Sequence, residues 1–279
     1  MLVSHFFDLI PIWLLLIGTI LIMIVFIEYG FRLGKRAQAH AKKAQTSQVR
    51  AIMGAGLGLL AFMLAFTFAT AQSHFEVRVQ SLAEEARIAR NAFMQADLLR
   101  EPGRTQARQL LKDYVELRAE LKEISGDNVA EQVAELIRMS ENIHRQLWSL
   151  AAGSDGQSTL DASQIEQHDL FMVSVLALSD VHYTRVHSAI MNRIPLTIWM
   201  TLYLMAALAM IIMGYQAGLT DRRSPVATIT LACAFSAVII LITDLDRPVM
   251  SFFEINKQLL VDLYEYMAAD LRLEYFPND

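Results

Sequence analysis

Four long stretches of the chain contain no Asp, Glu, Lys or Arg, and charged segments separate them. A helix needs about 20 apolar residues to cross the hydrocarbon of a bilayer, and each stretch is of that order. The pattern therefore predicts four transmembrane helices, grouped two and two around a polar insert. The four stretches are 9–27, 51–75, 194–220 and 224–243.

Apolar residues in the insert recur at alternating steps of three and four, which is typical of one buried side of a helix. We call each such row of apolar residues a seam. The first seam follows the second apolar stretch with no Pro or Gly between them, so we expect one unbroken helix that runs through both and ends before Glu101-Pro102-Gly103. Three further helices are predicted, the last two separated by the loop 152–163, rich in Gly, Ser and Asp. The seams comprise Phe75, Val79, Leu82, Ala86, Ala89, Phe93 and Ala96; Leu110, Tyr114, Leu117, Leu121 and Ile124; Val129, Val133, Leu136, Ser140, Ile143, Leu147 and Leu150; and Met172, Leu176, Ser179, Tyr183, Val186 and Ile190.

These periods predict an all-α fold: four transmembrane helices with an inserted extramembrane antiparallel helical bundle between spans two and three. After the fourth span, residues 252–271 have one apolar side, which indicates an amphipathic helix. The expected organisation is 1–72 for spans one and two with their loop, 73–193 for the bundle, 194–248 for spans three and four, and 249–279 for the C-terminal helix.

The charges of the short loops predict the orientation of the chain in the membrane. The loop 28–50 holds six basic residues and one acid, and the turn after the third stretch adds Arg222 and Arg223. Since cytoplasmic loops are enriched in Lys and Arg, we expect a multi-pass protein of a bacterial inner membrane, with the bundle and both termini in the periplasm. The leader 1–8 has no Lys or Arg, so the first span is expected to stay as an anchor.

Composition argues against several functions. A net charge of −5 gives no case for nucleic acid binding, and the single cysteine, Cys233, excludes an internal disulfide and cysteine metal sites. His182 and His187 are five residues apart, which does not suit a zinc helix, so no metal is expected. No phosphate-binding loop or cofactor fingerprint is present, so we expect neither a cofactor nor an enzyme.

Span two permits two interpretations. In one, its small residues let another span approach closely, and the site is structural. In the other, several copies bring span two to a common axis, where Phe62 and Phe66 narrow a hydrophobic neck. Polar surface at one mouth of that pore would come from Thr67, Thr70 and Gln72. The helix-packing ridge consists of Gly54, Gly58, Ala61, Ala65 and Ala69.

A second group of candidate residues is charged and lies where the last span ends. Arg247 is flanked by Asp244 and Asp246 at the edge of the hydrocarbon, where an unpaired charge is costly. We expect it to bond an acid at the base of the bundle, as a structural charge joint that also involves Glu84 and Glu85. If the protein were an enzyme acting on a lipid or envelope substrate, its candidate polar residues would be Glu84, Glu85, His182 and Arg247.

Several motifs resemble the bestrophin-like membrane proteins of bacteria. They are Leu59 to Phe68 running into Phe75-Glu76 and Glu84-Glu85-Ala86, then Ala96-Asp97-Leu98-Leu99, Tyr114-Val115-Glu116 and Asp244-Leu245-Asp246-Arg247-Pro248. True bestrophins are pentameric anion channels whose second span lines the pore with bulky apolar residues one turn apart. The resemblance implies this role for Phe62 and Phe66, although the next turn brings Thr70. No acidic cluster matches the bestrophin calcium clasp, so calcium gating is not implied.

Two functions follow from these patterns. The first is a homo-oligomeric, bestrophin-like ion channel, a pentamer by analogy, that sits in the lipid bilayer and passes inorganic ions through a pore lined by span two. The second is a non-conducting membrane scaffold or sensor whose helical bundle binds an envelope protein. Ion flux through the purified protein would distinguish them.

Overall fold

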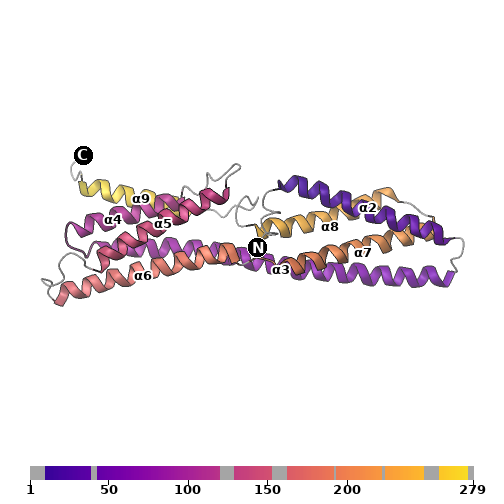
Figure 1. The fold of residues 1–279 in the computed structure, drawn as a ribbon, viewed down its shortest axis with the longest axis horizontal. Helices are drawn as coiled ribbons and strands as arrows, with labels where there is room; N and C mark the ends of the chain where they lie inside the picture. The colour runs from indigo at the N-terminus through magenta and orange to yellow at the C-terminus, as the bar shows by residue number, and fades with distance from the viewer. Residues whose placement is uncertain are drawn as a thin grey trace. The chain divides into compact units, whose positions relative to one another are not determined.

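The computed structural model describes residues 10–38, 43–119, 129–152, 162–191, 193–221, 224–247 and 258–275. Over these ranges every regular element is an α-helix, and no strand occurs (Figure 1). The prediction of an all-α fold is therefore confirmed. The helices are α2 (Ile12–Gln38), α3 (Lys43–Ala96), α4 (Gly103–Ala119), α5 (Val129–Ala151), α6 (Ala162–Met191), α7 (Leu196–Thr220), α8 (Pro225–Asp246) and α9 (Gln258–Tyr275).

The chain divides into two compact units. Unit 1 comprises Met1–Phe75 and Asn192–Phe253, and unit 2 comprises Glu76–Met191 and Glu254–Asp279. The helix α3 contributes its first part to unit 1 and its last part to unit 2, without a break in the helix. This agrees with the unbroken helix expected from the absence of Pro and Gly after the second apolar stretch.

Unit 1 contains three of the helices that are long and apolar enough to cross a membrane, and the first part of a fourth, α3. Four such helices are found among the described residues: Ile12–Ala37, Ser47–Ala96, Leu196–Thr220 and Pro225–Asp246. Many of their large apolar side chains are exposed, including those of Val25 in α2 and Leu204 in α7. An apolar surface of this extent suits a lipid solvent and not water. The prediction of four membrane-spanning helices is confirmed at the level of length and composition.

Within unit 1, α2 and α7 pack with their backbones in direct contact. Gly30 and Gly34 of α2 meet Gly214 and Gly218 of α7, and at each glycine a Cβ atom would collide with a backbone carbonyl of the partner helix. Both pairs have the spacing of a GxxxG motif, which lets two membrane helices approach closely. The small residues predicted to pack helices are in span two, and the glycines of spans one and three were not predicted to do so.

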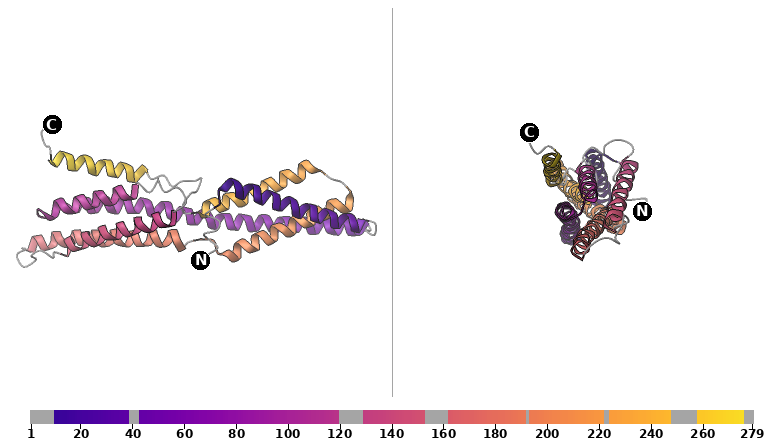
Figure 2. Two further views of the ribbon diagram at one scale, coloured as in Figure 1. Left: turned by 45° about the horizontal axis from the view of Figure 1, so that its top comes forward. Right: turned by 90° about the vertical axis from the view of Figure 1, so that its left-hand side faces the viewer.

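Unit 2 has its own apolar core, built from α3, α4, α5, α6 and α9. Figure 2 shows α9 lying along α4, in agreement with the contacts between these helices. The contacts of α5 are with α4 and α6. The largest fully buried side chains of unit 2 are those of Phe93, Leu111, Tyr114, Leu147, Phe171, Leu178 and Leu260.

The predicted seams match the buried residues in part. On α3 the seam is confirmed from Leu82 to Ala96. On α6 it is wrong, because Leu176 and Tyr183 are exposed. The buried side of α6 is displaced by about one position around the helix and consists of Phe171, Val175, Leu178 and His182. The loops 152–163 and 125–128, the basic pair Arg222 and Arg223, and the beginning of the predicted C-terminal helix lie mostly or wholly outside the described residues.

Candidate functional site

The first candidate site is the side of α3 that no other described helix of unit 1 covers, which we call the open side of α3. Phe62 and Phe66 lie one helical turn apart, and their exposed fractions are 64% and 57%. Gln72 is also exposed and Thr70 is half-buried. Thr67 differs, because it is only 2% exposed and faces α7. The open side of α3 therefore includes the two phenylalanines, whereas Thr67 turns away from it.

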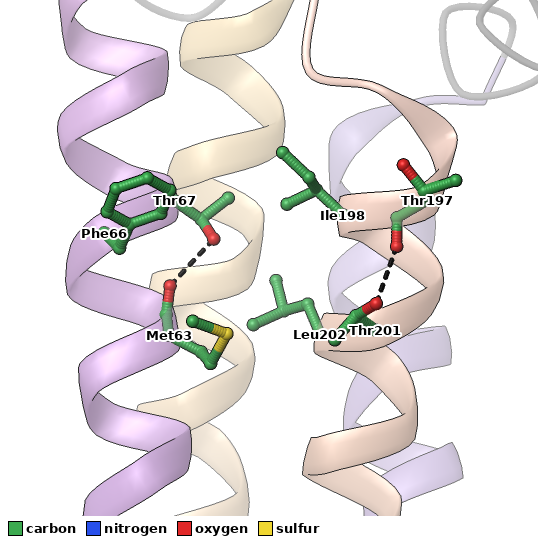
Figure 3. A pocket seen from close by; sticks show the side chains of 7 residues that line it. All are labelled: Met63, Phe66, Thr67, Thr197, Ile198, Thr201 and Leu202. Atoms are coloured by element: carbon green, nitrogen blue, oxygen red, sulfur yellow. Dashed lines mark hydrogen bonds between the residues drawn. The ribbon is translucent and has the colours of Figure 1, made fainter.

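Thr67 belongs to a groove between α3 and α7 that has a volume of about 180 Å³ (Figure 3). Its hydroxyl donates to the carbonyl of Met63 at 2.7 Å, and the hydroxyl of Thr201 donates to the carbonyl of Thr197 at 2.8 Å. Both hydroxyl hydrogens are therefore used within their own helices, and the surface left to the groove is mainly apolar. The wall is completed by Phe66, Ile198 and Leu202.

The small residues predicted to pack helices also lie on the open side of α3. A Cβ atom at Gly54 or Gly58 would have no heavy atom of the described chain within 4 Å. Ala61, Ala65 and Ala69 are likewise exposed. Within a single chain this ridge packs against no described helix, and its role in helix packing stays a prediction that requires another molecule.

The charged residues after span four lie in a buried part of unit 1. Asp246 accepts a hydrogen bond from the backbone N–H of Ile194 at 3.0 Å, and its carboxylate is 3.9 Å from His74 Nδ1. Arg247 donates to the carbonyl of Ile10 at 2.9 Å. Asp244 is buried as well. These contacts connect the end of α8 to the segments just before α2 and α7. The expected bond of Arg247 to an acid at the base of the bundle, in a joint with Glu84 and Glu85, stays a prediction, and Pro248 lies outside the described residues.

The two adjacent acids of α3 have different surroundings. Glu84 is exposed and pairs with Arg87, three residues further along the same helix, at 2.5 Å. Glu85 is 0% exposed and lies inside unit 2. Neighbouring side chains on a helix point about 100° apart, so one of the two can face solvent while the other is buried. Glu85 is the centre of the second candidate site.

The carboxylate of Glu85 is surrounded by donors from two other helices. It accepts hydrogen bonds from the Tyr114 hydroxyl, from Arg118 Nε at 3.0 Å and from Arg185 Nη1. Burial lowers the pKa of Arg118 and lowers the pKa of Arg185 to about 10. Arginine side chains nevertheless stay charged at neutral pH in proteins. Burial also raises the pKa of the Tyr114 hydroxyl, which stays protonated. One buried negative charge is therefore held by two positive ones.

Two histidines complete this cluster. His182 Nδ1 is 3.2 Å from the Tyr114 hydroxyl, and His144 Nδ1 is 3.2 Å from the Ser179 hydroxyl. The two imidazole rings lie with their centroids 4.8 Å apart. Burial, first of all, lowers the pKa of each histidine to about 4, with a further contribution from the charge of Arg118. Both rings are thus neutral at pH 7. We call Glu85, Tyr114, Arg118, His144, Ser179, His182 and Arg185 the buried polar cluster.

Only part of this cluster was predicted from the sequence. Glu85 and His182 were candidates, and they do come together, with Oε1 and Nδ1 3.9 Å apart. Glu84 faces solvent, and Arg247 belongs to unit 1. Tyr114 was placed in a core seam, but Arg118, His144 and Arg185 were not identified. A usable signal was present, because His144 falls four residues after the seam residue Ser140, on the same side of its helix.

His182 and His187 do not share a surface. His182 is buried, whereas His187 is exposed and stacks on Tyr183 with ring centroids 6.0 Å apart. Over the described ranges no group of three or more His, Cys, Asp or Glu side chains could hold a metal ion. The chemistry that the buried polar cluster supports is proton exchange at imidazole and the placement of fixed charge.

These features define an all-helical protein with four helices capable of spanning a membrane and a second unit that buries a charged network. A family model described as the Bestrophin-like domain matches residues 17–259. The chain therefore belongs to the bestrophin-like family, as the motifs of the sequence indicated. No match was found among the curated proteins or among the solved structures.

Proposed function

We propose that the protein is a homo-oligomeric ion channel whose pore is lined by α3 from several copies. The observation that supports this proposal is the open side of α3, where Phe62 and Phe66 are exposed beside a ridge of small residues. An exposed phenylalanine alone would suit contact with lipid. Exposed glycines one turn apart in a membrane helix instead suit close contact with another helix, and Gly54 and Gly58 find none within the described chain.

In this proposal the small residues pack against a neighbouring copy and the phenylalanines turn toward the common axis. A ring of apolar side chains gates by excluding water, and widening it favours a wetted, conducting pore. Thr70 and Gln72, further along the open side, supply polar surface at one mouth. Thr67 faces the groove with α7, so we assign it to helix packing and not to the pore.

We further propose the orientation that the basic loops favour, with unit 2 and both termini in the periplasm and the spans in the bacterial inner membrane. The permeant species would be inorganic ions, the assembly a pentamer by analogy with bestrophins, and the protein neither an enzyme nor a carrier of a cofactor. A test uses Asn142→Cys in the Cys233→Ala background, since Asn142 is exposed on α5. An impermeant thiol reagent should label it in intact spheroplasts.

Ion flux through purified protein in liposomes tests the channel. The double variant Phe62→Ala, Phe66→Ala should conduct at least about 10-fold faster than the unchanged protein, because removal of two rings widens the apolar neck. A matched control replaces apolar residues of similar exposure on other spans, Leu21→Ala in α2 and Leu204→Ala in α7. These variants should leave the flux unchanged.

The alternative function is a non-conducting scaffold or sensor. It is favoured by exposed apolar residues on α6, where Val173 is 62% and Tyr183 70% exposed within unit 2. An apolar surface of this kind suits a protein partner. If neither the unchanged protein nor the Phe62→Ala, Phe66→Ala variant passes any ion, while both remain folded in the liposomes, the channel proposal is wrong and the scaffold remains.

A further inference from the structure

We propose that His144 and His182 form a buried proton-binding site in unit 2, and that protonation of the pair loosens the packing of α5 and α6 against α3 and α4. This proposal concerns unit 2 alone and does not depend on ion conduction. It follows from the hydrogen bonds of the two rings, from the charges around them and from two buried ring nitrogens that have no hydrogen-bond partner among the described residues.

The hydrogen bonds determine which nitrogen of His182 carries the proton. The Tyr114 hydroxyl has a single hydrogen, and it donates that hydrogen to Glu85. The contact between Tyr114 and His182 Nδ1 can then be a hydrogen bond only if Nδ1–H is the donor. The neutral ring therefore has its free lone pair on Nε2. This atom is buried and has no hydrogen-bond partner among the described residues.

His144 resists a second proton in the same way, although its contacts do not fix its tautomer. Its Nδ1 lies beside the Ser179 hydroxyl, which can donate or accept. Its Nε2 is buried without a partner in the described part of the chain. A second proton on either ring would give both nitrogens an N–H. In the closed structure at least one of the new donors on each ring would have no acceptor, which is costly for a buried charged group.

The charges around the pair oppose a further positive charge. The α3 helix supplies Glu85, and α4 supplies Tyr114 and Arg118. On α6, Arg185 lies one turn after His182 and binds the same carboxylate. On α5, the exposed Glu141 lies three residues before His144 and favours a charged His182. Arg78 is buried two turns before Glu85 on the same side of α3.

Glu85 could in principle stabilise a protonated His182, since the two groups are 3.9 Å apart. Its charge is already shared by two guanidiniums, however, and its oxygens accept three hydrogen bonds. Two protonated rings would bring the buried cluster to four positive charges against one carboxylate. Repulsion and the missing acceptors act in the same direction, so the rings accept protons only when water reaches them.

Water can reach both Nε2 atoms only if the helices that enclose them separate. The rings come from α5 and α6, and their hydrogen-bond partners come from α6 and α4. A histidine with a pKa of about 4 in the closed state and about 6.5 in the open state favours opening about 20-fold more at pH 5 than at pH 7. For two such rings together, the equilibrium constant for separation of the helices is about 400-fold larger at pH 5 than at pH 7.

Amide hydrogen exchange of the full chain in lipid nanodiscs tests the proposal. Rates are measured at pH 7 and pH 5 and corrected for the intrinsic effect of pH on exchange. Core amides of α5 and α6 in the unchanged protein should lose protection by at least about 100-fold between the two pH values. The double variant His144→Gln, His182→Gln should lose less than about 5-fold, because glutamine keeps hydrogen-bonding capacity but takes up no proton.

The matched control is His187→Gln, which changes an exposed histidine five residues beyond His182 on the same helix. It should behave like the unchanged protein. If the double variant is already unprotected at pH 7, the single variants His144→Gln and His182→Gln decide the question, and each should retain a loss of only about 20-fold. Equal losses in the unchanged protein and the glutamine variants, or no loss in the unchanged protein, would overturn the proposal.

Discussion

Gly214 of α7 lies directly on the backbone carbonyl of Ile27 in α2, and the space between them cannot hold a Cβ atom. The contact is reciprocal one turn along, where Gly30 of α2 lies on the carbonyl of Ile211 in α7. In lipid, helices associate through such close packing, since burial of apolar surface supplies little driving force between them. Four glycines therefore determine how the first and third spans of unit 1 meet.

Gly214→Ala should destabilise unit 1. The added methyl group collides with backbone, which cannot move aside as a side chain can, so we expect a cost of about 1–3 kcal/mol. Thermal unfolding in detergent, followed by circular dichroism, measures the loss. Gly18→Ala in α2 is the control, because no heavy atom of the described residues lies within 4 Å of the new methyl group. Equal melting temperatures for the two variants would contradict the close approach.

Glu85→Gln should destabilise unit 2 far more than Glu84→Gln. The first substitution leaves Arg118 and Arg185 buried without their counter-charge, which typically costs about 3–5 kcal/mol. The second removes only an exposed ion pair with Arg87, which water screens and which contributes little to stability. Chemical denaturation of the two variants measures the difference. Similar losses in both would show that Glu85 does not hold the cluster together.

The free energy of unfolding should fall as the pH is lowered from about 6.5 toward 4. The folded pKa of His144 and of His182 is about 4, below the ordinary value of 6.5, so folding favours the neutral rings. Their contribution is fully present above pH 6.5 and is lost as the pH falls to 4. At pH 5 the loss is about 2 kcal/mol for each ring.

Denaturant titrations of the full chain at pH 7.5, 6 and 5 measure this loss. Carboxylates also take up protons in this range, so the comparison with His144→Gln, His182→Gln isolates the contribution of the rings. The variant should show a shallower decline than the unchanged protein. An identical decline in both proteins would assign the whole pH dependence to the carboxylates.

Arg108→Met should loosen the C-terminal helix α9. The guanidinium of Arg108 is buried, binds Asp97 and Asp270, and lies 4.5 Å from the centre of the Phe93 ring. Because Asp270 belongs to α9, the substitution removes a charged contact between this helix and the rest of unit 2. Amide exchange in α9 should accelerate by about 10-fold or more, equivalent to at least about 1.4 kcal/mol.

Arg87→Met is the control for this experiment, since Arg87 is exposed and pairs only locally with Glu84 among the contacts of the described residues. It should leave exchange in α9 unchanged. Should both variants accelerate α9 to the same degree, the contact through Arg108 would not be what holds the helix.

The helical content and the apolar spans could be predicted because they depend on local pattern. Runs without charge indicated the four spans, and the steps of three and four residues indicated the buried side of α3 around Leu82 and Phe93. The same reasoning failed on α6. Apolar residues occur there on more than one side, and Leu176 and Tyr183 are exposed while His182 is buried. When apolar residues occur on two sides of a helix, the spacing of these residues does not determine which side packs against the core.

The sequence by itself determined the all-α class, the four membrane-capable helices and the family, because charge, apolar length and motifs are properties of neighbouring residues. Only the tertiary structure decided that Glu85 and not Glu84 is buried, since the donors that hold it come from α4 and α6, far away along the chain. It also decided which glycines bring helices together. Whether a small or charged residue has a partner depends on which helix sides meet, and no local pattern contains that information.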